Sequence, residues 1–200
     1  NVPEKGISRR CAEFVTSLDH SDLGRETVSV TKKCIVDWLG CVLGGASTPA
    51  AGIIKGVVDE MGGREQATMA GDFSKTSVLQ AATVNAYNCH ILEMDDVHKS
   101  AVVHPAAPVI SAAFALGEYL GSSGKEVIEA IVAGYDVMIR IGEAVMPSHY
   151  AIWHSTATCG NFGAAAASAR LLKLGATQTL YSLGNAGTQA AGLWEFASDN

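Results

Sequence analysis

Apolar residues recur at three- and four-residue intervals along most of this 200-residue chain. That spacing places side chains on one face of an α-helix, whereas a half-buried strand needs strict alternation. Glycine and proline interrupt the pattern where helices stop or start, as at Gly44-Gly45 and Thr48-Pro49. We expect about eight helices, at residues 8–18, 27–45, 49–63, 76–93, 105–121, 123–145, 159–175 and 177–194, with Thr48 and Ser123 as N-cap residues. Beyond a brief extended piece at 66–71 there is almost no strand pattern, so the class is all-α, a multi-helix domain.

The chain fits one domain, or part of a larger one, with no repeat period, low-complexity tail or linker to divide it. Two hundred residues can bury a substantial core. Only 17% of the residues are charged, below the usual quarter. We therefore expect partner chains or further sequence to cover part of the surface. Because the chain begins at Asn1 and not at Met, we also expect the natural N-terminus to lie upstream.

Charge and cysteine content narrow the classes of function. The net charge of −6 disfavours binding to nucleic acids or anionic membranes, which relies on clustered Lys and Arg. The five cysteines are scattered, odd in number and without a C-x-x-C pair, so we expect buried thiols and no disulfide framework. No signal peptide is evident, and Pro147, two histidines and Asn161 interrupt the uncharged stretch 144–169. We expect a cytoplasmic protein without a membrane span.

The stretch LEMDDVHKSAVVHP, residues 92–105, gathers much of the titratable chemistry of the chain. Its acids Glu93, Asp95 and Asp96 are expected at the C-terminal end of a helix, where the macrodipole disfavours each carboxylate by roughly 0.3–1 kcal/mol. A solvated helix end could carry that cost. The apolar residues between the acids instead indicate partial burial, and buried carboxylates need cations or hydrogen-bond donors. The nearest candidates are His98, Lys99 and His104.

Two histidines are expected at the N-termini of helices. His104 precedes Pro105, and proline is a favoured first residue of a helix. His154 precedes three hydroxyl residues that are possible caps, Ser155, Thr156 and Thr158. Such positions bind anions and help to keep a histidine neutral as a base or donor, while a structural role is the alternative for both. The other histidines are expected at the surface or in packing: His20, His90 and His149.

The residues offer little for other kinds of site. Asp95, His98 and His104 are permissible metal ligands, yet no H-E-x-x-H or similar compact pattern is present, so we assign no metal. A G-x-S-x-G motif for a serine nucleophile is also absent. Gly160 and Gly163 lack the strand and the G-x-G turn of a dinucleotide site, so tight helix packing is the better interpretation.

Three segments together resemble the MmgE/PrpD family over nearly the whole chain: CIVDWLGCVLGG, EMDDVHKSAVVHP and HYAIWHSTATCGNFGAAAASARLLKLG. The specific combination is D-D followed by H-P, and then W-H-x-T-x-x-x-G-x-F-G-A. The family includes 2-methylcitrate dehydratase, cis-aconitate decarboxylase and iminodisuccinate epimerase. The spacing of Asp95, Asp96, His98 and His104 is similar to its fungal decarboxylase branch. Glu93 stands where many members have Asp.

The resemblance implies a large helical domain, a smaller α+β domain that this chain does not include, and a homodimer. It also implies cofactor-independent chemistry on a small di- or tricarboxylic acid, with the active site between the two domains. The chain ends at GLWEFASDN, before the family's T-K-x-x-H-x-G segment, so the lysines that the resemblance assigns to carboxylate binding lie outside it. We expect residues 1–200 to form a partial helical domain that holds half of a site and is inactive alone.

The first candidate function is that of a lyase of the 2-methylcitrate dehydratase type, with cis-aconitate decarboxylation or iminodisuccinate epimerisation as alternatives. His104 or His154 would move a proton beside a carboxylate, and Asp95 would orient that histidine or act as partner acid. Substrate contacts are expected from Glu93, Asp96, His98, Lys99 and Thr156. A non-catalytic helical scaffold that keeps the family fold is the alternative of another class.

Overall fold

The computed structural model describes residues 6–198, and its fold is all-α, as predicted. The longer helices are α1 (Ile7–Ser17), α2 (Arg25–Gly45), α3 (Pro49–Met61), α4 (Val78–His90), α5 (Ala106–Leu120), α6 (Gly124–Val145), α7 (Ser155–Leu171) and α8 (Ala176–Gln189). The short elements are η1 (His20–Asp22), η2 (His149–Ala151) and α9 (Glu195–Ser198). An antiparallel pair, β1 (Ala67–Thr68) and β2 (Lys75–Thr76), begins in the expected extended piece.

Two helices begin where the sequence predicts caps. The hydroxyl of Thr48 accepts a hydrogen bond from the amide of Ala51 at 3.2 Å, and Pro49 is the first residue of α3. The hydroxyl of Ser123 accepts from the amide of Glu126 at 3.3 Å, while the Glu126 carboxylate accepts from the amide of Ser123 at 2.8 Å. Both arrangements satisfy amides that have no partner inside the helix.

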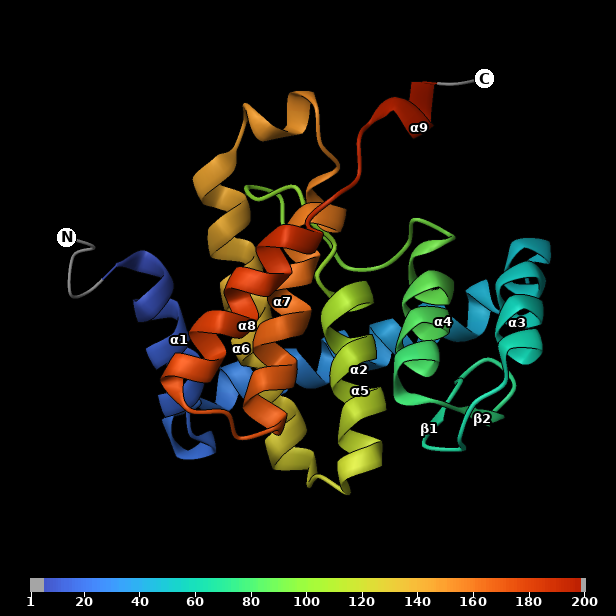
Figure 1. The fold of residues 1–200 in the computed structure, drawn as a ribbon, viewed down its shortest axis with the longest axis horizontal. Helices are drawn as coiled ribbons and strands as arrows, with labels where there is room; N and C mark the ends of the chain where they lie inside the picture. The colour runs from blue at the N-terminus through green and yellow to red at the C-terminus, as the bar shows by residue number, and fades with distance from the viewer. Residues whose placement is uncertain (1–5, 199–200) are drawn as a thin grey trace.

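Helix α5 packs against α4, α6 and α7, and most of its residues are buried (Figure 1). Helices α1 and α8 lie beside α7 on one side of the molecule, and α3 and the β1–β2 pair lie beyond α4 on the other. The backbones of α6 and α7 touch at Gly134 and Gly163. A Cβ added at Gly134 would lie 2.8 Å from the Gly163 carbonyl oxygen, and one at Gly163 would lie 3.1 Å from that of Gly134. The packing role predicted for Gly163 is therefore confirmed.

Four predicted helix boundaries are wrong by three residues or more. Two of them are the C-terminal ends of α7, at Leu171 and not at residue 175, and of α8, at Gln189 and not at residue 194. The other two are the end of α4 and the start of α7. Helix α4 ends at His90 and not at residue 93, and α7 begins at Ser155 and not at residue 159.

Residues 91–104 instead form an irregular loop, with left-handed backbone at Glu93 (φ 50°) and Val102 (φ 49°). The acids are therefore on a loop beyond the last turn of α4. No glycine or proline marks this helix end in the sequence. The path of the chain after His90 is set by hydrogen bonds of the loop to α5 and α7.

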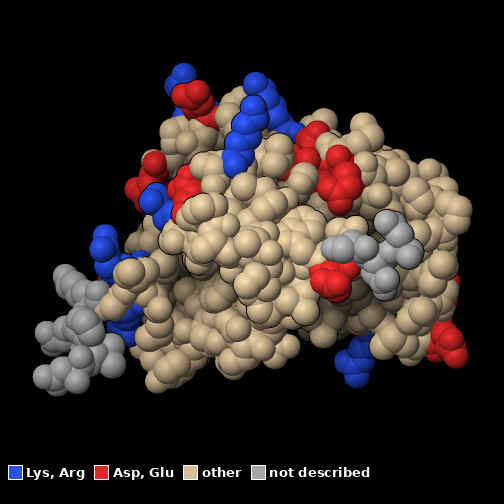
Figure 2. Space-filling model, turned by 90° about the horizontal axis from the view of Figure 1, so that it is seen from above, with Lys and Arg blue, Asp and Glu red and all other residues tan. Residues whose placement is uncertain are grey.

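Three expectations from composition can be compared with the structure. Figure 2 shows a broad area of one face without acidic or basic side chains, with the charged side chains gathered around it, in line with the low charge content. Across residues 6–198, no single helix is both long and apolar enough to cross a membrane; α2 and α3 pass that test only as a pair bent by 89°. The five cysteines are free thiols, but only Cys89 and Cys159 are fully buried.

Candidate active site

Asp95 is the centre of the candidate site. Its side chain is fully buried, at 0% exposure, in the loop that follows α4. The Nδ1 atom of His90 lies 3.0 Å from Oδ1 of Asp95. The Nδ1 atom of His104 lies 3.3 Å from the same oxygen and 3.3 Å from the backbone carbonyl oxygen of Asp95, which also accepts a hydrogen bond from this ring. Because an ionised carboxylate only accepts hydrogen bonds, both rings carry their proton on Nδ1. One carboxylate thus orients two imidazoles.

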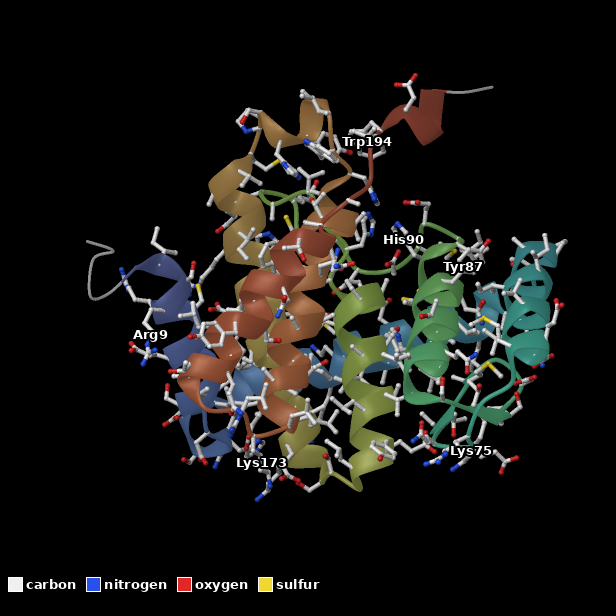
Figure 3. The ribbon with its side chains drawn as sticks, viewed as in Figure 1. Arg9, Lys75, Tyr87, His90, Lys173 and Trp194 are labelled. Atoms are coloured by element: carbon white, nitrogen blue, oxygen red, sulfur yellow. The ribbon has the colours of Figure 1, made fainter. Side chains whose placement is uncertain are left out.

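Three elements bring three imidazoles together. His90 is the last residue of α4, His104 lies two residues before α5, and His154 is the N-cap residue of α7. The ring centroid of His90 is 4.9 Å from that of His104 and 5.9 Å from that of His154. Trp194, from the segment before α9, packs edge-on against His154 at 4.8 Å (Figure 3). His104 and His154 both lie at helix starts, as predicted, and the ring of each lies beside that of His90.

The pKa values of these groups are displaced in different directions. Burial alone would raise the pKa of Asp95, but hydrogen bonds from His104 and His90 outweigh it and lower the pKa to about 2. The hydrogen bond to Asp95 raises the pKa of His104. Burial, together with the neighbouring His90 and His104 rings, lowers the pKa of His154. Opposite displacement of two titratable groups is how a site separates an acid from a base.

A cavity of about 550 Å³ opens beside the imidazoles. His90, Glu93, His154 and Thr156 contribute polar groups to its wall, and alanines of α4, α5 and α7 line much of the remainder. His104 is not a lining residue; it reaches this wall through Asp95 and its ring contact with His90. Within residues 6–198, no Lys or Arg lines the cavity. A polycarboxylate would need cationic groups from elsewhere.

Glu93 lies on the cavity wall, as expected for a residue in substrate contact. Its side chain is 70% exposed, and its Oε1 atom lies 3.4 Å from Nε2 of His90. The left-handed backbone at this residue turns the chain directly after α4. Glu93 and Asp95 are therefore on opposite edges of the same imidazole.

Asp96 holds the start of α5. Its carboxylate accepts hydrogen bonds from the amide of Ala106 and from the hydroxyl of Tyr135, both at 2.9 Å. Burial raises the pKa of Asp96. The carboxylate thus accepts a hydrogen bond from the first amide of the helix that follows His104, a position at which we expected an anion to bind. Asp96 does not line the cavity, so its predicted substrate contact is absent from this geometry.

The hydroxyls after His154 do not cap α7, contrary to the sequence prediction. The helix starts earlier than expected, so Ser155 and Thr156 lie inside its first turn. The hydroxyl of Ser155 donates to the carbonyl oxygen of Val102 at 2.8 Å, and that of Thr156 accepts from the amide of His104 at 3.0 Å. These hydroxyls therefore attach the loop 91–104 to α7. Thr156 also lines the cavity, where a substrate contact was predicted.

His98 and Lys99 lie at a narrow turn of the loop. The amide of His98 donates to the carbonyl oxygen of Val103 at 2.9 Å, and Nδ1 of His98 lies 3.4 Å from the hydroxyl of Ser100. Lys99 is exposed. Neither residue lines the cavity, so the predicted substrate contacts of both are not made there. Lys99 does not supply the missing positive charge.

The turn also changes the set of residues with metal-ligand geometry. The structure does not bring His98 to Asp95 and His104; His90 takes its place, and the ligand atoms of these three residues lie within 4.8 Å of one another. Hydrogen bonds between the same atoms account for the arrangement. We therefore describe the cluster as a hydrogen-bonded network and assign no metal to it.

His90 is the residue that sequence reasoning missed. It was expected at the surface or in packing, and its contact with Asp95 shows that this prediction is wrong. If the helix continued through residue 95, the side chains of residues 90 and 95 would point about 140° away from each other. Only the end of α4 at His90 lets the chain reverse toward its ring. By contrast, His149 is a packing residue, with Nε2 2.7 Å from the hydroxyl of Thr158.

Residues 9–200 match the MmgE/PrpD N-terminal domain. The cis-aconitate decarboxylase-like protein oryM of Aspergillus oryzae is 28% identical over 202 residues, which cover 96% of this chain and 42% of that protein. Cis-aconitate decarboxylase of Aspergillus terreus is 28% identical over 197 residues, covering 95% of this chain and 40% of that protein. The chain thus spans about two-fifths of the length of these relatives. With an all-α fold and a domain match along nearly all of its length, the chain belongs to the MmgE/PrpD family.

Proposed function

We propose that the complete protein is a lyase that removes CO₂ from a tricarboxylate of the cis-aconitate type, and that this chain supplies its proton-transfer groups. The observation that carries the proposal is the Asp95–His104 pair beside His154, with histidine pKa values displaced in opposite directions. Relatives named as cis-aconitate decarboxylases support the choice of substrate. The proposal needs no cofactor.

Decarboxylation leaves an electron pair on the carbon that loses CO₂, and a proton must replace the lost group. A histidine with a raised pKa suits this task, because the shift favours its protonated form and general acids work best when their pKa is near the operating pH. Asp95 favours that form of His104 and fixes its Nδ1 edge. Because His104 does not line the cavity of this chain, the proposal places the reacting carbon on the side of this ring that the other part of the protein completes. Nε2 of His104 gives the carbon its proton, and solvent restores the proton on the ring.

His154 has the complementary role. Its lowered pKa keeps the ring neutral, so it can accept a hydrogen bond or a proton beside a substrate carboxylate. The N-terminus of α7, where His154 is the N-cap residue, favours a nearby anion through its backbone amides. Cations for the remaining carboxylates would come from the other part of the protein, and we expect residues 1–200 alone to be inactive.

Dehydration of 2-methylcitrate is the second candidate, and the same displacement of pKa values favours it. A dehydratase needs a base for the proton beside the carboxylate and an acid for the leaving hydroxyl. His154 and His104 would fill these roles in that order. Iminodisuccinate epimerisation, the homodimer and the cytoplasmic location stay predictions. A non-catalytic scaffold has no need of a buried carboxylate shared by two imidazoles.

The test is to incubate the complete protein separately with cis-aconitate, 2-methylcitrate and iminodisuccinate and to follow the products by NMR. We expect cis-aconitate to lose one carbon as CO₂. Conversion of 2-methylcitrate alone would reverse the order of the two candidates. No turnover of any of the three substrates by folded protein would contradict the lyase proposal and favour the scaffold.

A further inference from the structure

His90 contacts both acids of the loop that faces it. Its Nδ1 atom lies 3.0 Å from Oδ1 and 3.2 Å from Oδ2 of Asp95. Its Nε2 atom lies 3.4 Å from Oε1 of Glu93 and is buried, without a hydrogen-bond partner that meets normal geometry. The ring therefore connects one acid in the interior to one acid on the cavity wall.

The loop needs such an attachment point. Glu93 and Val102 adopt left-handed backbone, which is unfavourable for residues with a side chain and persists only where surrounding contacts impose it. The buried carboxylate of Asp95 also needs donors. Its imidazole donors are His90 and His104, and the thiol of Cys89, at 4.0 Å from Oδ2, is a weak partner. Of the two imidazoles, His90 is the one that comes from a regular helix.

We propose that His90 is a positioning residue: it fixes the Asp95 carboxylate against His104 and holds Glu93 at the wall of the cavity. The position and the pKa of His104 would then depend on His90 through Asp95, although the two rings touch directly only edge to face. The structural part of the proposal stands by itself. Its catalytic consequence rests on the proposed function, so the two parts need separate experiments.

The first experiment measures the protonation of His104 in the complete protein by NMR of labelled histidines. The charged and titratable groups that face His104 are Asp95 and Glu93 from the loop, His90 from α4 and His154 from α7. If His90 positions Asp95, His90→Ala lets the carboxylate move and the pKa of His104 falls toward its ordinary value. If His90 is only a neighbouring charge, its removal raises the pKa of His104 or leaves it unchanged, and either outcome overturns the proposal.

Two conservative variants separate the two edges of the ring. Asn places its amide nitrogen near the position of Nδ1, so His90→Asn should keep the donor for Asp95 and preserve the raised pKa of His104. Gln places its amide nitrogen near the position of Nε2, so His90→Gln should behave like His90→Ala. Equal titration of His104 in these two variants contradicts the assignment of Asp95 to the Nδ1 edge. His149→Asn, outside the cluster, is the matched control and should leave His104 unchanged.

The second experiment measures steady-state rates with the substrate that the complete protein converts. We expect His90→Ala to lower kcat at least tenfold with KM within threefold, because the change displaces a proton donor and not a binding group. His90→Asn should return kcat to within threefold of wild type. Wild-type kcat in a folded His90→Ala variant overturns the catalytic part. If wild type converts none of the substrates, the proposed function fails, and the titration of His104 still decides the role of His90.

Discussion

The helix starts next to His104 and His154 look alike in sequence and differ in the structure. At α5, Asp96 accepts a hydrogen bond from the first amide. The imidazole of His104 lies against Asp95, with Nδ1 3.3 Å from both its carboxylate and its backbone carbonyl oxygen. At α7, no side chain caps the helix within the described residues, and the ring of His154 lies among other aromatic rings. The pKa is raised for His104 and lowered for His154. Neighbouring carboxylates and burial, more than the macrodipole, therefore decide the charge of these histidines.

Replacing each histidine by Gln in the complete protein should give the largest effects. Acid–base groups typically contribute about 10²–10⁴-fold, so we expect kcat to fall roughly 10²–10³-fold in either variant. The pH profiles should differ, since His104→Gln removes the alkaline limb set by a raised pKa and His154→Gln removes the acidic limb set by a lowered one. Initial rates across pH measure both. His149→Gln should keep the wild-type profile, and identical profiles for the two variants would show that the rings are equivalent.

Asp95→Asn should make His104 resemble His154, because it removes the carboxylate that distinguishes them. The pKa of folded Asp95 is about 2, below its ordinary 3.8. The ionised Asp95 carboxylate therefore stabilises the fold fully above about pH 3.8, and this contribution is lost as the pH falls through about 2. The displacement corresponds to roughly 2 kcal/mol.

Urea unfolding at pH 5 and pH 2.5 measures this contribution to the free energy of unfolding. Asp95→Asn should lose less stability on acidification than wild type. Asn185, exposed on α8 and without a titratable side chain, provides a control, since Asn185→Ala should follow the wild-type pH dependence. A steeper loss in Asp95→Asn than in wild type would mean that the native state does not favour the ionised carboxylate.

Tyr135→Phe should give the smallest effect, and it tests whether Asp96 only stabilises the start of α5. It removes one of the two hydrogen bonds to Asp96 at the start of α5. We expect the free energy of unfolding to fall by about 1–2 kcal/mol, with kcat within threefold of wild type. Tyr119→Phe, at an exposed position, is the control for urea unfolding. A large loss of kcat at unchanged stability would place Asp96 in the chemistry.

The sequence was sufficient for features that depend on local rules. Thr48 and Ser123 cap helices because their hydroxyls accept hydrogen bonds from amides three positions ahead. The apolar period located α5 and α6 to within a few residues. The end of α4 at His90 was not predictable in this way, because the residues that follow continue the apolar period and hold no glycine or proline.

The candidate site depended more on contacts between distant segments. Pro105 and the run of hydroxyls after His154 indicated two helix starts, and the resemblance linked both to one site. The sequence did not indicate that Asp96 would bind the start of α5 while Asp95 turned to the imidazoles, since adjacent carboxylates look equivalent in one dimension. His90 was missed for the same reason: its partner depends on a chain reversal set by tertiary packing.

The contact between Gly134 and Gly163 affects the position of His154, although both glycines lie far from its ring. His154 is nine residues from Gly163 along α7, which is about 13 Å at 1.5 Å per residue. A side chain at either glycine would force the two helices apart, and a tilt of about 5° there would shift the imidazole by roughly 1 Å, a misplacement that can slow a reaction about 10²-fold. The absence of a side chain at Gly134 and at Gly163 therefore helps to fix the position of the His154 ring.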